Sequence, residues 1–211
     1  MDLFPILGPG YTKSHFVSLD LSLAHLISQG REELHQVESY ILNATDHFRL
    51  IPYGGYLEHR GPYQSTLFIN KRAPIRDIHL GVDFWTQEGA PVYAPLDGTI
   101  HSFAYNGNHL DYGYTLILQH FWEGQTIYAL YGHLSGAYMN QWVKGMQIEK
   151  GMQIANVGGR TENGGWLPHL HFQLIRDLEE KFGDYPGVCA QVDLNYYVSN
   201  CPDPSILCAT K

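Results

Sequence analysis

The chain has 211 residues, of which 44% are hydrophobic and 16% are charged. This length and balance predict a globular protein with one buried core and extensions, or at most two small domains, and exclude a disordered chain. The formal net charge is −8, and the sequence contains no dense cluster of lysine and arginine. Nucleic acid is therefore not expected as a partner, because neutralising phosphates requires a basic face.

The start of the sequence predicts neither export nor membrane insertion. Asp2 stands where a signal peptide carries positive charge, and Pro5, Gly8 and Pro9 interrupt the apolar run around it. No apolar stretch approaches the length needed to span a bilayer. We therefore expect a cytoplasmic protein without a membrane span, with a periplasmic or secreted location by an unrecognised route as the alternative. The oligomeric state cannot be predicted from these features.

Histidine content indicates metal chemistry without locating the site. The chain has 12 histidines against 13 lysines and arginines, and imidazole is a common ligand of transition metals. The cysteines do not point to a structural zinc site or a disulfide scaffold, because they are odd in number and lack Cys-x-x-Cys spacing. All three lie near the C-terminus: Cys189, Cys201 and Cys208.

The first 48 residues predict a helical N-terminal extension, residues 1–48, with a packing role. Apolar side chains recur at helical spacing between Asp20 and Leu42. Gly30 is expected to separate two helices or bend one, and Asp20 and Ser22 are candidate N-caps.

Short β-favouring runs separated by turn signals follow Pro52. They predict a mainly β fold, an antiparallel sheet or flattened barrel-sandwich, over a domain at 49–178. The domain is followed by a C-terminal tail at 179–211. The mixed last segment, from Arg176 to Lys211, carries two short elements, a helix at Asp177–Lys181 and another element at Asp193–Val198. The predicted strands are Thr66–Ile69, Ile78–Phe84, Pro91–Ala94, Gly98–Tyr105, Tyr114–His120, Thr126–Leu134, Gln153–Val157 and His169–Ile175.

The last of these strands carries two histidines, His169 and His171, one residue apart. Alternate side chains of a strand leave the same face, so both imidazoles can reach one site. His79 and Asp83 are four residues apart upstream, and Gly81 between them allows a bend that brings the two side chains together. Together with one histidine of the later pair, they supply two imidazoles and one carboxylate. Three protein ligands and an open fourth position are typical of catalytic zinc.

A further histidine, His133, ends a β-favouring run and precedes a turn. These pieces, in this order, resemble the lysostaphin/LytM-type zinc metallopeptidases, most of which cut peptide bonds in bacterial cell-wall peptidoglycan. The resemblance covers roughly residues 70–176. It rests on His79–Asp83, Gly89–Ile100, Tyr131–Leu134, Val143–Gly158 and Pro168–Phe172.

The resemblance implies one Zn²⁺ per chain, held by His79, Asp83 and His171. It also implies that His133 and His169 form the catalytic pair beside the metal-bound water, and that the substrate is a peptide or peptidoglycan. A zinc ion with two neutral imidazoles and one carboxylate can activate water and polarise a carbonyl. A neighbouring histidine can accept the proton of the water, and another can stabilise the oxyanion. Tyr131 and Trp166 are predicted to line the substrate cleft.

Two departures leave the substrate open. The residues from Thr161 to Pro168 differ from the family pattern, and Gln173 stands where the family often has glutamate. The stretch Phe182–Val188, followed by Cys201–Leu207, resembles the joint after a peptidase-like module in large bacterial fusions. There the module lies between a kinase-like domain and a class-III aminotransferase, which implies an intracellular substrate other than cell wall. Three rival functions are a non-catalytic regulator of wall hydrolases, a cupin-type metal barrel, and a carrier or phosphotransfer module.

Overall fold

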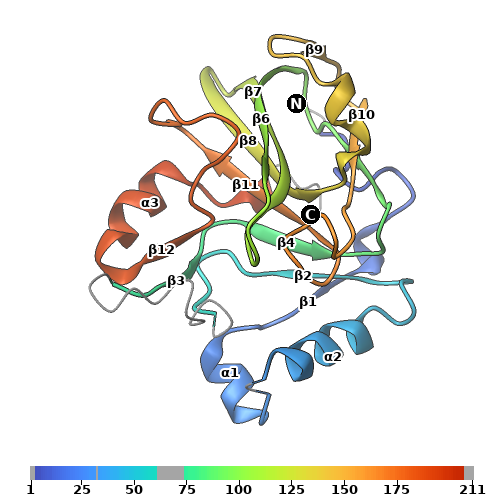
Figure 1. Ribbon diagram of the computed structural model, residues 1–211, viewed down its shortest axis with the longest axis vertical. Coiled ribbons are helices and arrows are strands. Elements are labelled where there is room, and N and C mark those ends of the chain that lie inside the picture. Colours follow the sequence, from blue (N-terminus) through green and yellow to red (C-terminus); the bar gives the residue numbers. More distant parts are fainter. Residues whose placement is uncertain (1–2, 32, 61–73, 207–211) are drawn as a thin grey trace.

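The computed structural model describes residues 3–31, 33–60 and 74–206 of the chain. An eight-stranded sheet dominates the fold, with the strand order β1-β2-β4-β11-β8-β7-β6-β9 (Figure 1). Its strands are β1 (Phe16–Ser18), β2 (Ile51–Gly54), β4 (Val82–Trp85), β6 (Gly98–Asn106), β7 (Gly113–Trp122), β8 (Gln125–Leu134), β9 (Gln147–Ile148) and β11 (His169–Ile175).

Two small sheets flank this large sheet. One pairs β5 (Pro91–Tyr93) with β10 (Gln153–Asn156), and the other pairs β3 (Arg76–His79) with β12 (Val188–Ala190). The α-helices are α1 (Leu23–Ser28), α2 (Leu34–Ala44) and α3 (Leu194–Asn200), and short 3-10 helices occur at Lys13–His15, Gly136–Gln141, Gln191–Asp193 and Pro204–Ile206. Every helix in the described part of the chain is too short or too polar to cross a bilayer.

The prediction of a mainly β fold is confirmed, and the large sheet is antiparallel except for the parallel pair β1 and β2. The predicted strand Thr66–Ile69 lies outside the described residues. The predicted strand Ile78–Phe84 is wrong in one respect, because a bend at Gly81 divides it into β3 and β4, which belong to different sheets. The other predicted strands correspond to β5, β6, β7, β8, β10 and β11.

The predicted helix at Asp177–Lys181 is wrong. Glu179 and Glu180 have positive φ angles of 52° and 65°, a left-handed conformation that a right-handed helix cannot contain. The carboxylate of Glu179 accepts hydrogen bonds from Lys181 and from the Tyr196 hydroxyl. These contacts accompany a turn instead of a helix.

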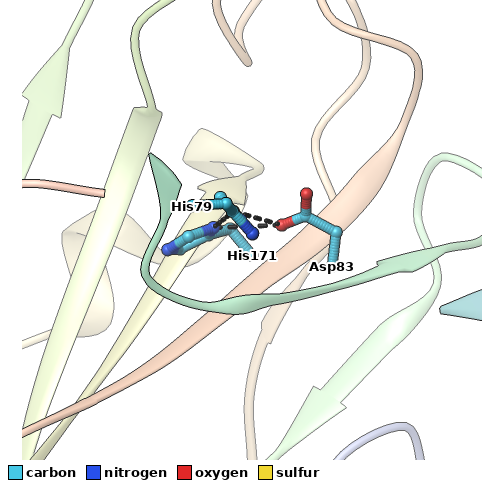
Figure 2. Close-up of side chains that lie close together, drawn as sticks. All are labelled: His79, Asp83 and His171. Atoms are coloured by element: carbon cyan, nitrogen blue, oxygen red, sulfur yellow. Dashed lines mark hydrogen bonds and ion pairs between the residues drawn. The ribbon is translucent and has the colours of Figure 1, made fainter. Parts of the chain in front are cut away.

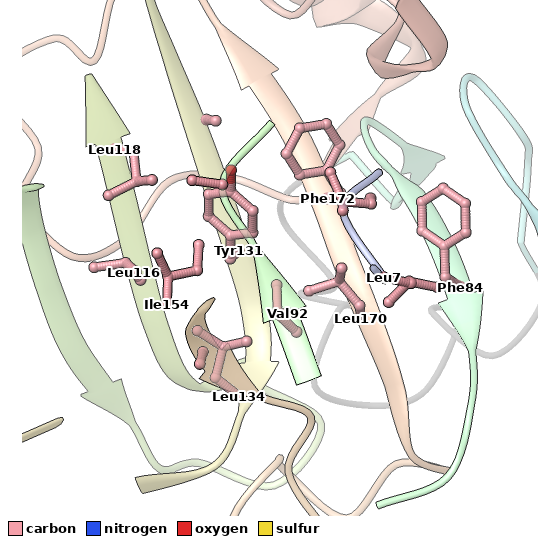
Figure 3. Packing of buried hydrophobic residues seen from close by; sticks show 14 of the residues in the cluster. Leu7, Phe84, Val92, Leu116, Leu118, Tyr131, Leu134, Ile154, Leu170 and Phe172 are labelled. Carbon is pink, nitrogen blue, oxygen red and sulfur yellow. The ribbon is translucent and has the colours of Figure 1, made fainter. Parts of the chain in front are cut away.

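The two faces of the large sheet pack against different layers. Strand β11 turns Leu170, Phe172 and Leu174 into the main core, where Phe172 lies beside Tyr131 (Figure 3). The next residue along, Ile175, belongs to a second apolar cluster that includes Tyr185 and Cys189. Because both faces are covered, every residue of β11 is buried. Polar side chains on this strand therefore need partners inside the protein.

The N-terminal segment contains the two expected helices but is not only helical. The hydroxyl of Ser22 accepts a hydrogen bond from the His25 amide and caps α1, and Gly30, with φ +65°, lies between α1 and α2. Strand β1 adds to the large sheet, and Ile6 and Leu7 are buried in the main core. Residues before position 49 are therefore part of the folded body.

The C-terminal residues also pack closely. Strand β12 pairs with β3, so that Val188 lies opposite His79, and α3 occupies the place of the predicted element at Asp193–Val198. Cys189 and Cys201 are buried free thiols, while Cys208 lies outside the described residues. This segment consequently supports the strand that carries the first predicted metal ligand.

Candidate active site

Three predicted ligands meet where the bend between β3 and β4 crosses β11 (Figure 2). The Nε2 atom of His79 lies 3.0 Å from Nδ1 of His171. Oδ1 of Asp83 lies 3.0 Å from Nδ1 of His171 and 3.4 Å from Nε2 of His79. All three side chains are buried. The chain therefore brings two imidazole nitrogens and one carboxylate oxygen to a single point from positions about ninety residues apart.

Gly81 makes this crossing feasible. A Cβ atom at this position would lie 2.5 Å from Cε1 of His171 and 2.8 Å from the Phe172 carbonyl oxygen. Both distances are shorter than real Cβ contacts, so any side chain here would push the bend away from β11. The predicted role of Gly81 in bringing His79 and Asp83 together is thus supported by a close approach that only glycine allows.

Hydrogen bonds on the outer side fix the orientation of both histidine ligands. The Nδ1 of His79 lies 3.0 Å from the Gly55 carbonyl oxygen, and the Nε2 of His171 lies 3.0 Å from Oε1 of Gln173. Each of these outward nitrogens carries the ring proton and donates it. The other nitrogen of each ring, Nε2 of His79 and Nδ1 of His171, therefore has a lone pair that faces Asp83. This arrangement of outward N–H donors is typical of histidines that hold a metal.

The donor set fits a metal ion. The two imidazole nitrogens that face each other at 3.0 Å are both acceptors, because the outward nitrogens donate to Gly55 and Gln173. A cation between them and the carboxylate satisfies all three lone pairs. The ligand atoms lie within 4.8 Å of one another. The His-Asp-His cluster can therefore hold a metal.

Arg60 is a fourth buried member of the site that the sequence did not indicate. Its guanidinium donates to Oδ2 of Asp83 and to Oε2 of Glu58, the second at 2.8 Å, and it lies over the Trp85 ring. Burial raises the pKa of Asp83, but its electrostatic interactions with His79, Arg60 and His169 outweigh this effect, so the pKa of Asp83 lies well below its usual value. Asp83 is consequently ionised throughout the neutral range.

His133 and His169 lie next to each other, beside the ligand cluster. Their ring centroids are 4.2 Å apart. The Nδ1–H of His133 donates to the Asn163 carbonyl oxygen at 3.1 Å, and that of His169 donates to the Leu167 carbonyl oxygen at 2.7 Å. Each ring therefore keeps an unprotonated Nε2, and that of His169 lies 3.9 Å from Oδ1 of Asp83.

Burial keeps these histidines neutral. Desolvation is the main reason that the pKa of His79 falls to about 4, with the Arg60 charge adding to the effect. Desolvation also lowers the pKa of His169, and it lowers that of His133 well below the usual value, with repulsion from His169 as the second cause. At neutral pH these rings can accept a proton, which is a requirement for a general base.

The backbone of His133 has a positive φ of 61°. A histidine rarely adopts this conformation, and such residues concentrate at functional sites. The preceding residue, Gly132, lies opposite His171 on β11, and a Cβ there would come within 2.6 Å of the Tyr112 ring. The end of β8 is therefore shaped to place the His133 ring beside β11.

A cleft of about 580 Å³ opens beside the site. His79, His133 and His171 form part of its wall, and Trp166 lines it as predicted. The prediction that Tyr131 lines the cleft is wrong, because Tyr131 is fully buried in the main core. It lies next to Gly132 in a strand whose side chains alternate, so it belongs to the opposite face of the sheet.

Comparisons with known proteins agree with the geometry. The model of "Peptidase family M23" matches residues 77–182, half of the chain. An "Uncharacterized metalloprotease" of Haemophilus influenzae is 34% identical over 120 residues, which cover 56% of this chain and 23% of the relative. The "Peptidoglycan DD-endopeptidase ShyB" of Vibrio cholerae is 33% identical over 115 residues, which cover 51% of this chain and 24% of the relative.

The chain thus spans about a quarter of the length of these curated relatives. Among solved structures, the antimicrobial peptidase lysostaphin from Staphylococcus simulans is similar, with 25% identity and a TM-score of 0.42 over 75% of this chain and 49% of the other. The family match covers the segment that carries the ligand cluster and the histidine pair. The chain belongs to peptidase family M23.

Proposed function

We propose that this chain is a zinc peptidase domain that hydrolyses an amide bond in a peptide of the peptidoglycan type. The observation that carries the proposal is the meeting of five buried side chains in one cluster: His79, Asp83, His133, His169 and His171. Three of them offer lone pairs to a metal, and two stand beside it with free ring nitrogens.

Zinc suits this donor set. Two imidazole nitrogens and one carboxylate oxygen, with room for a fourth ligand, are a common arrangement around catalytic zinc. When bound, zinc lowers the pKa of water towards about 7 and polarises the carbonyl of the scissile amide. His79, Asp83 and His171 would hold the ion in this role, and Gly55 and Gln173 would keep the two imidazoles in the required tautomers.

The histidine pair would move the protons. His133 and His169 are neutral at pH 7 because burial lowers both pKa values. One ring can take a proton from the attacking water through Nε2 and pass it to the leaving amine. The other, once protonated, can donate a hydrogen bond to the oxygen on which negative charge develops. The backbone carbonyls of Asn163 and Leu167 hold the rings in place for these steps.

The substrate class rests on the relatives and on the cleft. A relative is named as a peptidoglycan DD-endopeptidase, and the cleft of about 580 Å³ is large enough for several residues of an extended chain. A peptide stem or cross-bridge of the cell wall is therefore the proposed substrate. The alternative that the experiment below distinguishes is a peptide that does not come from the cell wall.

The test is hydrolysis by the purified full chain loaded with zinc. Isolated peptidoglycan, oligoglycine and peptides with D-amino acids serve as substrates, and new amines are measured with and without a chelator. We expect cleavage of a wall peptide that stops on chelation and returns with added zinc, and cleavage slowed by roughly 10²–10⁴ in the matched variant His133→Ala. Cleavage that survives chelation contradicts the proposed mechanism, whereas zinc retention with no cleavage of wall peptides contradicts the proposed substrate.

A further inference from the structure

A second, smaller and more apolar pocket also borders the site. Its volume is about 50 Å³, and it extends from Asp83, Trp85 and His169 to the helical pair α1–α2. Trp166 lines both the pocket and the cleft. The site residues are therefore divided between two cavities of different size: Asp83 and His169 line the pocket, and the other three histidines line the cleft.

The wall made by α1–α2 comes from outside the family match. Leu26, Leu34, Val37 and Ile41 of these helices line the pocket, whereas the family model covers residues 77–182. Leu26, Val37 and Ile41 are buried in one apolar cluster with Trp85. The helical wall of the pocket therefore lies outside the segment that the family model matches.

Direct contacts hold that wall in position. The Leu21 amide donates to Oε1 of Glu58 at 2.8 Å, and the other oxygen of Glu58 accepts from Arg60. Arg60 in turn donates to Asp83. A chain of hydrogen bonds therefore connects Leu21, two residues before α1, to a proposed metal ligand.

The charges around the pocket are already neutralised. Arg60 is paired with Asp83 and Glu58, and Glu38 of α2 is paired with Arg160 at 2.9 Å. A charged substrate group would lose its hydration here without gaining a new partner, which is unfavourable. An aliphatic group would gain from leaving water.

The volume limits the size of that group. A site needs roughly 10–15 Å³ for a single water, so a pocket of about 50 Å³ suits a compact group of a few carbon atoms. A leucine side chain has four carbon atoms, and a benzyl group has seven. We infer that this pocket receives the side chain next to the scissile amide, that it selects aliphatic groups up to the size of leucine, and that Leu34 and Val37 set this limit.

This inference rests on the proposed function, but binding can test it without turnover. The probes are acyl hydroxamates, which ligate zinc and carry a methyl, isobutyl or benzyl group: acetohydroxamate, 3-methylbutanohydroxamate and phenylacetohydroxamate. Their affinity for the zinc-loaded full chain is measured by calorimetry. We expect 3-methylbutanohydroxamate to bind at least about tenfold more tightly than acetohydroxamate, and the phenyl compound to show no such gain.

Two matched variants assign the effect to the pocket. Leu34 and Leu42 both lie on α2 and are 46% and 41% exposed, but only Leu34 lines the pocket. Leu34→Trp should reduce the gain for the branched compound to less than about threefold, while Leu42→Trp should keep it. Val37→Ala, which widens the pocket, should admit the phenyl compound.

The outcomes separate the two proposals. A parent protein that does not retain zinc overturns both the proposed function and this inference. A parent that retains zinc but shows no gain for the branched compound, or equal gains in Leu34→Trp and Leu42→Trp, overturns the inference alone. Equal affinity of the parent for the branched and phenyl compounds overturns the size limit.

Discussion

The two faces of strand β11 are equally buried and chemically opposite. One face places Leu170, Phe172 and Leu174 in the main core, and the other presents His169, His171 and Gln173 to the site. Each apolar side chain stabilises the folded protein through the area that it removes from water. Each polar side chain requires named partners, because an unsatisfied buried group costs about 1–3 kcal/mol.

The contrast shows what each face determines. Apolar packing tolerates replacement by side chains of similar volume. The apolar face therefore contributes to the fold and not to the chemistry of the site. The polar face fixes which nitrogen of each ring is free, through Leu167, Gln173 and Asp83. Substitutions on the two faces should consequently affect different measurements.

The largest effect is expected from His171→Ala, which removes one of three proposed metal ligands. The variant should lose its zinc on dialysis. Its zinc affinity should fall by more than the ~10–100-fold typical of residues that only hydrogen-bond to a ligand. Metal analysis of the dialysed protein measures the effect, and circular dichroism checks the fold. A variant that binds zinc as tightly as the parent would show that the ligand assignment is wrong.

His133→Ala should separate metal binding from catalysis. His133 lies beside His169 and outside the ligand cluster, so the variant should keep its zinc. Turnover should fall by roughly 10²–10⁴, the usual contribution of a general acid or base. Steady-state kinetics on the same preparation used for metal analysis gives both values, and unchanged kcat would remove His133 from the mechanism.

Leu174→Ala tests the apolar face. Leu174 is fully buried in the main core, and its truncation should lower the free energy of unfolding by about 2–5 kcal/mol. Zinc affinity in the folded protein should stay within about twofold of the parent, because the substituted side chain points away from the cluster. Urea unfolding and a competition titration with a chromophoric chelator measure the two quantities. A large loss of zinc affinity would mean that the faces are not independent.

Gln173→Met is the matched change on the polar face, one residue earlier in the same strand. It removes the acceptor for the Nε2–H of His171 and the donor to the Pro186 carbonyl oxygen. Zinc affinity should fall by about 10–100-fold. The same chelator titration measures this, and an affinity equal to that of the parent would show that the amide does not hold the ring.

Acid should destabilise the metal-free protein through the polar face. The pKa values of His79, His133 and His169 are lowered from 6.5 by burial, so below pH 6.5 the unfolded chain binds protons that the folded chain does not. The free energy of unfolding therefore falls as the pH drops from 7 to 5, by up to about 1.4 kcal/mol per pH unit for each histidine. Urea unfolding at pH 7, 6 and 5 should show this dependence of the free energy of unfolding on pH. His133→Gln should reduce its slope by the contribution of one histidine. A stability that does not change with pH would contradict the buried neutral histidines.

The parts of the site that could be predicted are those that depend on local geometry. Alternation in a strand places His169 and His171 on one face, and a glycine between His79 and Asp83 permits the bend. The helices of the N-terminal segment follow from apolar spacing and the Ser22 cap.

The rest depends on tertiary contacts that no local pattern contains. Arg60 contacts Asp83 from a position 23 residues earlier in the chain. No sequence motif around either residue indicates this contact. Strand β1 has three residues and is stabilised by pairing with β2, so its own sequence gives little signal. The predicted helix at 177–181 fails because Glu179 is held by Lys181 and Tyr196. The pocket under α2 could not be foreseen, since it requires the packing of α1–α2 against Trp85.

Crystals of the zinc-loaded protein, measured on both sides of the zinc absorption edge, test the site most directly. One anomalous peak should lie about 2.0–2.2 Å from Nε2 of His79, Nδ1 of His171 and Oδ1 of Asp83, with His133 and His169 outside the coordination sphere. A peak bound by other side chains, or none between these three atoms in protein that carries zinc, would contradict the proposed metal centre.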